Sequence, residues 1–368
     1  MGIGRFAFTP LLPLMLQEHS ITLSQGAWLA AANYVGYLIG AAASFSLMPR
    51  PEIALRYALI SVALTTGAMA ATDSYWAWIG LRCAAGVASA FALVAASAWA
   101  LSLLSTHRRA DLGGWVFAGV GVGIVLAGGV TFTTAANGYE AQVAWTLLGC
   151  SAAVVAALVW PTLGRRNKLP GSLETPGARA RLGVVEWSLI LSYGIFGLGY
   201  IIPATFIPAI ARTLVEDPRI FGWAWPLFGV AAAASTVLVT RYLHRTPPRT
   251  VAVWSLLVMA IGVVLPALVA NIAVIAVSAL CVGGTFMVMT MAGFQEARRI
   301  SSGPPARLIA IMTAAFAVGQ LLGPILVGVD AAKADAVVLP SLIASSGLVA
   351  AAATLAFGPT KPRTELVA

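Results

Sequence analysis

Long apolar runs recur along the whole chain, with short polar connections between them. Each run is continuous over about 20 residues, the length needed to cross the hydrocarbon core of a bilayer. No run alternates with the period of two that marks a barrel strand. Hydropathy therefore predicts an all-α polytopic membrane protein with twelve transmembrane helices. These cover residues 1–17, 25–47, 57–73, 76–103, 113–135, 142–163, 185–211, 220–242, 250–269, 271–296, 308–329 and 336–357.

One connection divides the predicted helices into two groups of six. It covers 164–184 and is polar and rich in proline and glycine. We therefore expect an N-terminal six-helix bundle over 1–163 and a C-terminal six-helix bundle over 185–357. The segment 164–184 then forms a cytoplasmic linker, and 358–368 forms a cytoplasmic tail.

Small-residue motifs of the first group recur in the second group in the same order. Gly2, Gly4, Pro13 and Trp28 recur as Gly197, Gly199, Pro208 and Trp223, at an offset of 195 residues. Cys83 and Gly86 recur at an offset of 198 as Cys281 and Gly284, and Gly119, Gly123 and Gly128 recur at an offset of 200 as Gly319, Gly323 and Gly328. This order indicates a duplication. Because six spans return the chain to its starting side, the two repeats must be parallel, related by an axis along the membrane normal.

Composition and charge support the membrane assignment. The chain is 60% hydrophobic and only 10% charged, whereas soluble domains are about 25% charged. Seventeen basic residues fall in the connections on the side of the N-terminus, and only Arg212, Arg219 and Lys333 fall in those on the other side. By the positive-inside rule, both termini are cytoplasmic. We expect a bacterial cytoplasmic (inner) membrane protein, and the net charge of +9 then needs no nucleic-acid partner.

The opening GIGRFAFTPLLPLM resembles the first helix of the YbfB/YjiJ branch of the major facilitator superfamily. The resemblance covers essentially the whole chain, because span number, central loop and helix motifs agree. It implies the major facilitator fold, with a substrate site between the halves near the midplane. It also implies transport by alternating access, in which the halves rock around that site.

Two superfamily motifs are matched to different degrees. The fourth-helix pattern, an arginine followed four residues later by glycine, is matched by Arg82 and Gly86, and in relatives this arginine is linked to proton coupling or substrate binding. The fifth-helix antiporter pattern is only partly matched, because Ile124 stands where proline is expected. The version with proline occurs in span 11, at Gly323-Pro324.

The loop motif between the second and third helices is degraded to MPRPEIALR. Arg50 and Arg56 remain as candidates for a cytoplasmic gate, to which we add Glu296 at the end of span 10. The alternative for Glu296 is an ion pair with Arg298 or Arg299 beside it.

Two arginines, Arg5 and Arg82, fall inside apolar spans. A charge at depth costs about 2.5–3.5 kcal/mol, so each side chain should face a cavity or a partner. Arg82 is expected to bind substrate, and the alternative is a structural arginine bonded to backbone carbonyls. Arg5 lies about 16 Å below the outer end of its helix, at the midplane. The first helix is then short at its N-terminus, and we expect Met1 to be an internal methionine.

No carboxylate is predicted deep in any span, since Glu18, Glu186 and Glu296 lie at span ends. Two cavity arginines would make the pathway positive, which favours an anionic substrate such as an organic acid. Protons remain a candidate coupling ion, because a proton can travel with the substrate or compete at an arginine. Further side chains expected to line the cavity are Asn33, Tyr34, Tyr37, Tyr193, Tyr200 and Trp225.

Glycines and prolines are expected to set helix packing and bending. Close helix contacts or hinges are predicted at Gly119, Gly123, Gly128, Gly319, Gly323 and Pro324. Bends are expected at Pro10, Pro13, Pro203, Pro208 and Pro324.

The sequence thus predicts a monomeric secondary transporter of a small organic solute, an anion being favoured. Efflux of neutral or cationic compounds such as sugars or drugs is an alternative, and a non-transporting membrane sensor is another. An enzyme is not expected, because the chain has no HExxH, no GxxxxGK[ST] and no intramembrane Asp pair. The cysteines and histidines lack metal-ligand spacing, so neither a metal nor a cofactor is expected.

Overall fold

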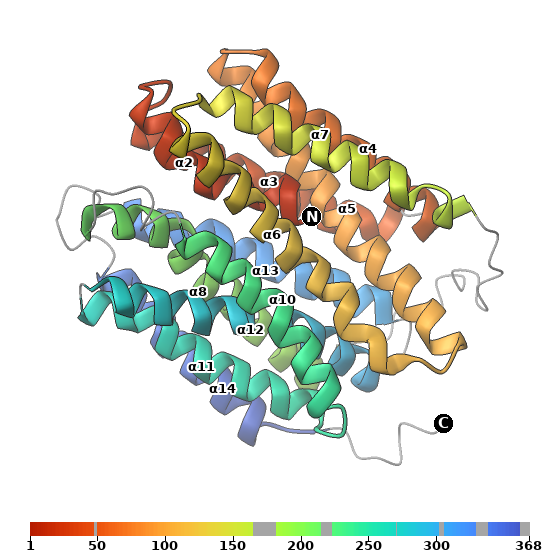
Figure 1. The fold of residues 1–368 in the computed structure, drawn as a ribbon. Coiled ribbons are helices and arrows are strands. Elements are labelled where there is room, and N and C mark those ends of the chain that lie inside the picture. The colour runs from red at the N-terminus through yellow and green to blue at the C-terminus, as the bar shows by residue number, and fades with distance from the viewer. Residues whose placement is uncertain are drawn as a thin grey trace.

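The computed structural model describes residues 1–47, 50–164, 182–214, 223–269, 271–301, 305–328 and 338–360. In these ranges the regular structure is helical throughout (Figure 1). Most of the predicted linker 164–184 and of the predicted tail 358–368 lies outside the described residues.

Every predicted span corresponds to helix. The first group contains α1 (Gly2–Phe6), α2 (Phe8–Gln17), α3 (Leu23–Leu47), α4 (Pro51–Ala68), α5 (Tyr75–Thr106), α6 (Gly113–Ala136) and α7 (Ala141–Val159). The second contains α8 (Val184–Leu214), α10 (Ala224–Tyr242), α11 (Pro248–Leu268), α12 (Ile272–Ile300), α13 (Pro305–Gly328) and α14 (Val338–Phe357). Short 3-10 turns are η1 (Met69–Ala71), η2 (Ala110–Leu112) and η3 (Thr162–Gly164). Among the described residues, nine helices are long and apolar enough to cross a membrane. The protein is an all-α, multi-span membrane protein.

The start of α4 differs from the hydropathy prediction by six residues. The helix begins at Pro51, preceded by an extended Arg50, with Glu52 in its first turn. Proline at the first helical position and an acid near the N-terminus are both favourable there. Hydropathy missed this turn because Glu52 and Arg56 lower its apolar average.

The first span is broken, and its break lies at Ala7 between α1 and α2. Pro10 has no N–H to give to the Phe6 carbonyl, and this lost bond weakens the helix at this point. The bend expected from prolines in this span therefore falls three residues before Pro10.

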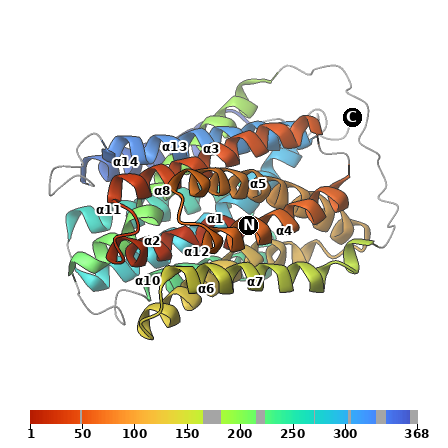
Figure 2. The ribbon, with the colours of Figure 1, turned by 90° about the horizontal axis from the view of Figure 1, so that it is seen from above.

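Most helices pack mainly on helices of their own sequence group, and two large contacts join the groups. In the first group α3 packs on α5 and α4 packs on α7, whereas in the second α8 packs on α13 and α11 packs on α12 and α14. The joining pairs are α6 with α10 and α3 with α13, which lie side by side in Figure 2. We refer to the two groups as the N-half and the C-half. The connections after α3, α5, α10 and α12 share one end of the bundle, which we call the basic end because it carries Arg50, Arg108, Arg109, Arg241, Arg245, Arg298 and Arg299.

The α6–α10 seam is built on glycines spaced seven residues apart. A Cβ on Gly121 would lie 2.6 Å from the Gly229 carbonyl oxygen, and one on Gly128 would lie 2.7 Å from Cδ of Pro226. Gly114 meets Thr236 and Thr240 in the same way. The two backbones are therefore in contact along most of their length, as small residues permit in membrane helices.

One glycine prediction needs correction. Gly119 was expected to pack against a neighbouring helix, but nothing lies within 4 Å of the position its Cβ would occupy. The packing face of α6 is instead set by Gly114, Gly121 and Gly128, which lie on a different side of the helix from Gly119.

Gly121→Ala should lower the free energy of unfolding by about 1–3 kcal/mol, the range for overpacking a tight contact. Gly119→Ala, two residues away on the same helix, has open space and serves as the matched control. Thermal unfolding of the detergent-purified protein measures both. Equal melting temperatures for the two variants would show that the seam does not depend on glycine.

Candidate substrate-binding site

Arg5 lies at mid-depth between the two halves. Gly2, three residues before Arg5, packs on the middle of α6. A Cβ on Gly2 would lie 2.6 Å from the Val120 carbonyl oxygen and 2.7 Å from Cα of Gly123. The N-terminus accordingly lies in the middle of the bundle (Figure 1). The Arg5 side chain is only 3% exposed. The expected depth of Arg5 is therefore observed.

The Arg5 guanidinium contacts both halves. Its Nη2 donates to the Tyr200 hydroxyl of α8 at 3.2 Å, and its Cζ lies 4.0 Å from the ring centroid of Tyr37 of α3. Its Nε and Nη1 have no hydrogen-bond partner among the described residues. Cation–π contact lowers the cost of burying this charge, but two nitrogens remain available to an acceptor.

Arg5 and Tyr200 are equivalent positions of the sequence repeat, because they are separated by 195 residues. Their surroundings agree with this equivalence. Gly2 packs on α6, and the equivalent Gly197 packs on Phe316 of α13, which is the helix of the second repeat that corresponds to α6. Two equivalent residues meet only where they lie close to the axis that relates the repeats. The Arg5–Tyr200 hydrogen bond thus marks the centre of the two-repeat architecture.

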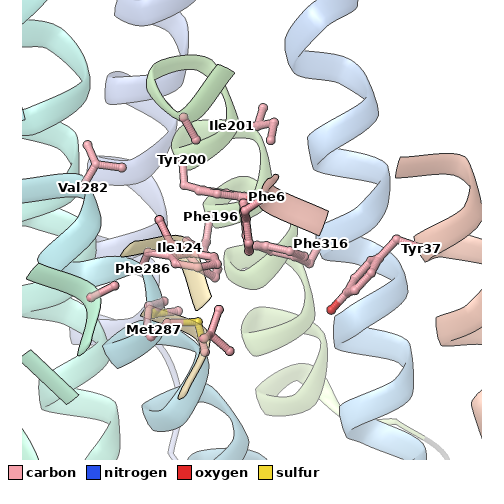
Figure 3. Packing of buried hydrophobic residues seen from close by; sticks show 14 of the residues in the cluster. Phe6, Tyr37, Ile124, Phe196, Tyr200, Ile201, Val282, Phe286, Met287 and Phe316 are labelled. Atoms are coloured by element: carbon pink, nitrogen blue, oxygen red, sulfur yellow. The ribbon is translucent and has the colours of Figure 1, made fainter. Parts of the chain in front are cut away.

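Aromatic rings fix the position of Tyr200. Its ring stacks on Phe286, with 4.6 Å between the ring centroids and 16° between the ring planes. It also stacks on Phe316, with a centroid distance of 5.4 Å and an interplanar angle of 9°. Phe6 packs on Phe286 at 5.6 Å, and Phe196 lies 4.9 Å from Phe316. Figure 3 shows these rings gathered between the ribbons of both halves, with Tyr37 approaching from α3. The stacked rings hold the hydroxyl at a fixed height beside Arg5.

Two polar residues of this site, Gln320 and Thr205, were not predicted. Gln320 is fully buried, and its Nε2 donates to the Tyr200 hydroxyl at 2.5 Å, while its Oε1 has no partner in the described chain. Thr205 of α8 and Tyr34 of α3 share a hydrogen bond of 3.3 Å, a second polar link between the halves. A lone amide within an otherwise apolar span was the signal for Gln320.

Arg82 has the structural role that was its alternative. Its Nη1 and Nη2 donate to the carbonyl oxygens of Gly4 and Arg5, both at 3.2 Å, and Asn33 Nδ2 donates to the Arg82 carbonyl at 2.9 Å. Carbonyls in the last turn of a helix lack intrahelical partners, and α1 ends just beyond these two. Arg82 therefore holds the broken end of α1, and with it the backbone of Arg5. Its Nε has no hydrogen-bond partner among the described residues, and substrate binding by Arg82 stays a prediction.

Tyr193 and Trp225 extend the same aromatic region. Tyr193 packs on Phe196 at 5.3 Å, and Trp225 stacks on Phe228 at 5.1 Å. Trp225 also lies 6.3 Å from Phe6, and its Nε1 has no partner within the described chain. These residues surround the centre, and no hydrogen bond is observed between either of them and Arg5.

The three residues predicted to form a gate do not meet. Arg50 is exposed ahead of α4, and Arg56 lies over Trp160 with 4.8 Å between its Cζ and the ring centroid. Glu296 is buried and pairs with Arg299 of its own helix at 3.0 Å. This ion pair is the alternative considered for Glu296, and the gate is not assembled in this conformation.

The remaining predicted glycines do pack. Gly123 meets Gly2, Gly128 meets Pro226, and Gly323 meets Ile201. Gly319 approaches the α8 backbone, where its Cβ would lie 2.8 Å from the Leu198 nitrogen. Pro324 lies in α13, and its side chain is outside the described residues.

Carboxylates of the described chain lie at helix ends, away from Arg5. Glu18 follows α2, and its Oε1 accepts from the Ala141 N–H at 2.7 Å, across to the start of α7. Burial raises the pKa of the Glu18 carboxyl against the opposing effect of this hydrogen bond. Arg5 consequently has no anionic partner in the described part of the chain.

The comparisons with known proteins decide the family. A family model described as "Uncharacterised MFS-type transporter YbfB" matches residues 1–356. The chain belongs to this family. Among solved structures, the human organic anion transporter MFSD10 (TETRAN) is similar with a TM-score of 0.69 and 15% identity over 96% of each chain. No curated protein matches the sequence.

Membership in this major facilitator family confirms the resemblance found in the opening motif, and the family is one of transporters. The human structure confirms the fold over nearly the full chain. A residue at the contact of two parallel repeats then lies where transporters of this architecture bind substrate. The Arg5–Tyr200 pair is the candidate centre of that site.

Tyr200→Phe should lower the free energy of unfolding by about 1.5–3 kcal/mol, the range for a hydrogen bond to a charged group. The phenyl ring keeps both stacking partners, and the hydroxyl that accepts hydrogen bonds from Arg5 and Gln320 is lost. Tyr34→Phe removes a neutral hydrogen bond between the same halves and should cost about 0.5–1.5 kcal/mol. Thermal unfolding in detergent compares them. A smaller loss for Tyr200→Phe than for Tyr34→Phe would contradict the central role of this contact.

Proposed function

We propose that this protein is a secondary active transporter of a small organic anion, working by alternating access in the bacterial cytoplasmic membrane. The observation that supports it is Arg5, a buried guanidinium at the junction of the halves with Nε and Nη1 unpartnered in the described chain. An uncompensated charge at such depth is costly and calls for a counter-charge. An anionic substrate supplies one.

The surroundings of Arg5 favour a carboxylate with an apolar body. Arginine offers planar donors that match carboxylate geometry. Rings of Phe6, Tyr34, Tyr37 and Phe316 have their centroids within 4.0–5.9 Å of the guanidinium. An aromatic or branched organic acid uses both features. The similar human protein is an organic anion transporter, but at 15% identity its structure supports the fold alone, and the proposal rests on Arg5.

We place the basic end of the bundle in the cytoplasm. Its connections carry the excess of arginine, and cytoplasmic loops are enriched in basic residues. The C-terminus is then cytoplasmic. This orientation sets the direction in which a membrane potential acts on an anionic substrate.

Two alternatives make different demands on the site. Efflux of cationic drugs calls for an anionic side chain at depth, whereas the described carboxylates lie at helix ends. A neutral sugar offers no charge to Arg5. A non-transporting sensor would bind the same anion without moving it, so measured uptake separates it from a transporter.

Arg5→Gln should reduce the uptake efficiency for the preferred carboxylate at least about thirty-fold, the loss expected when one partner of a buried charge pair is removed. The uptake efficiency of Arg5→Lys should lie between those of the wild type and Arg5→Gln, because lysine keeps the charge and loses the planar donors. A thermal-shift screen of organic acids, neutral sugars and cationic drugs first identifies the ligand. Uptake into proteoliposomes, with and without a pH gradient, then measures transport and proton linkage.

Arg245→Gln is the matched control, because Arg245 is an exposed arginine of the basic end. The neutral amide of the preferred acid is the matched substrate control. Equal uptake by the wild type and by Arg5→Gln, when both proteins are folded and reconstituted to the same density, would exclude the anion site at Arg5.

A further inference from the structure

Gln320 of α13 brings an amide to the contact between Arg5 and Tyr200. Phe316 and Gln320 lie one helical turn apart, so both side chains are on the same face of α13. Phe316 stacks on the Tyr200 ring, and its ring centroid lies 5.5 Å from Cζ of Arg5. Gln320 Nε2 donates to the Tyr200 hydroxyl. Gln320 is therefore part of the immediate surroundings of the guanidinium.

The hydrogen bonds around the Tyr200 hydroxyl are incomplete. Its oxygen accepts from Arg5 Nη2 and from Gln320 Nε2, which uses both of its lone pairs. No bond in which this hydroxyl donates is observed among the described residues, and Gln320 Oε1 has no partner there. A half-turn of the amide would let Tyr200 donate to Oε1, and Nε2 would then be the atom without a partner. In either orientation, one end of this buried amide is unsatisfied.

The fold itself does not require an amide at this position. The helices α6 and α13 correspond in the repeat at an offset of 200 residues, so the counterpart of Gln320 is Val120. Val120 is buried in the same way without a polar side chain. Burying a polar group without a partner costs free energy, and nearly all buried polar groups in proteins have one. An unsatisfied amide where valine suffices points to a partner that is not part of the described chain.

The unsatisfied amide lies on the C-half side of Arg5. Tyr200 and Gln320 are on α8 and α13, which pack closely on each other. The residues of α1 ahead of Arg5 contact other helices, because Gly2 packs on α6, and Gly4 packs on α4 and α5. The unsatisfied atoms therefore belong to the junction between Arg5 and the C-half, and not to the surroundings of the start of α1.

We propose that Gln320 selects a substrate with a hydroxyl group next to its carboxylate, which is the class of 2-hydroxy acids. The carboxylate accepts from Arg5, and the hydroxyl bonds to the Gln320 amide. Because Arg5 and Gln320 donate to the same oxygen atom, these two substrate groups have to be close together. A hydroxyl both donates and accepts, so it satisfies the amide in either orientation.

This inference rests on the proposed function, because it takes the carboxylate on Arg5 as given. The atoms concerned are buried between the halves, so the substrate reaches them when the halves move apart, as alternating access requires. Gln320 then acts as a specificity-determining residue, and the hydroxyl distinguishes the substrate from a plain carboxylic acid of the same shape.

The test is isothermal titration calorimetry of the full chain in detergent with matched pairs of acids. Mandelate and phenylacetate share a carboxylate and a phenyl ring, and only mandelate has the 2-hydroxyl group. The acids 2-hydroxyisovalerate and isovalerate repeat the comparison with a branched aliphatic body. We expect the hydroxy acid of the better-binding pair to bind at least about ten-fold more tightly than its partner, because the partner leaves the amide unsatisfied. This comparison on the wild type needs no variant.

Gln320→Met removes the amide and nearly conserves the side-chain volume. In this variant the hydroxy acid should lose its advantage, whereas the plain acid keeps its affinity. The ratio of the two affinities is the readout, because a general disturbance of the site weakens both acids alike. Gln142→Met is the matched control, since Gln142 is an exposed glutamine in the first turn of α7 that bonds to Asp73.

The outcomes separate this inference from the proposed function. Equal binding within both pairs, with all binding weakened by Arg5→Gln, would overturn selection of the hydroxyl and leave the anion site in place. A preference that persists unchanged in Gln320→Met would overturn the role of Gln320. Mandelamide keeps the hydroxyl and lacks the carboxylate. If it bound as tightly as mandelate, or if none of the acids bound the wild type, the anion site would fail and this inference with it.

Discussion

A buried positive charge between two repeats is the constraint on which this structure depends. Arg5 lies at mid-depth, 3% exposed, and the described carboxylates lie at helix ends. The protein lowers the cost of this charge with the Tyr37 ring at 4.0 Å and the Tyr200 hydroxyl at 3.2 Å, and it leaves Nε and Nη1 unpartnered. A fully paired arginine would be more stable and would have no reason to bind a substrate. Partial compensation is what a binding site requires.

The rest of the fold holds this charge at the contact between the halves. Arg82 fixes the carbonyls of Gly4 and Arg5, so the broken end of α1 keeps one position. Phe286 and Phe316 both stack on the Tyr200 ring and hold it in place. Glycines at seven-residue spacing bring α6 and α10 into backbone contact and so join the halves beside the site. Because Arg5 and Tyr200 are equivalent positions of the repeat, the two halves meet at one repeated position through a donor and an acceptor.

The sequence predicted the spans well because lipid imposes a strong requirement on every residue that crosses it. It predicted the depth of Arg5 for the same reason. It did not settle the role of Arg82, because cavity lining and backbone bonding place the same residue type at the same depth. It chose Gly119 over Gly121 because nearly every face of this helix is apolar and small, so periodicity does not show which face has a partner. Gln320 and Thr205 depend on partners more than 100 residues away, which no local pattern records.

The most direct test is a cryo-electron microscopy structure with the preferred carboxylate bound. The account predicts a carboxylate within hydrogen-bond distance of Arg5 Nε or Nη1, enclosed by Phe6, Tyr37 and Phe316, with Arg82 still bonded to the carbonyls of Gly4 and Arg5. A carboxylate bound elsewhere, with Arg5 and Tyr200 unchanged and Nε and Nη1 still without a partner, would contradict it.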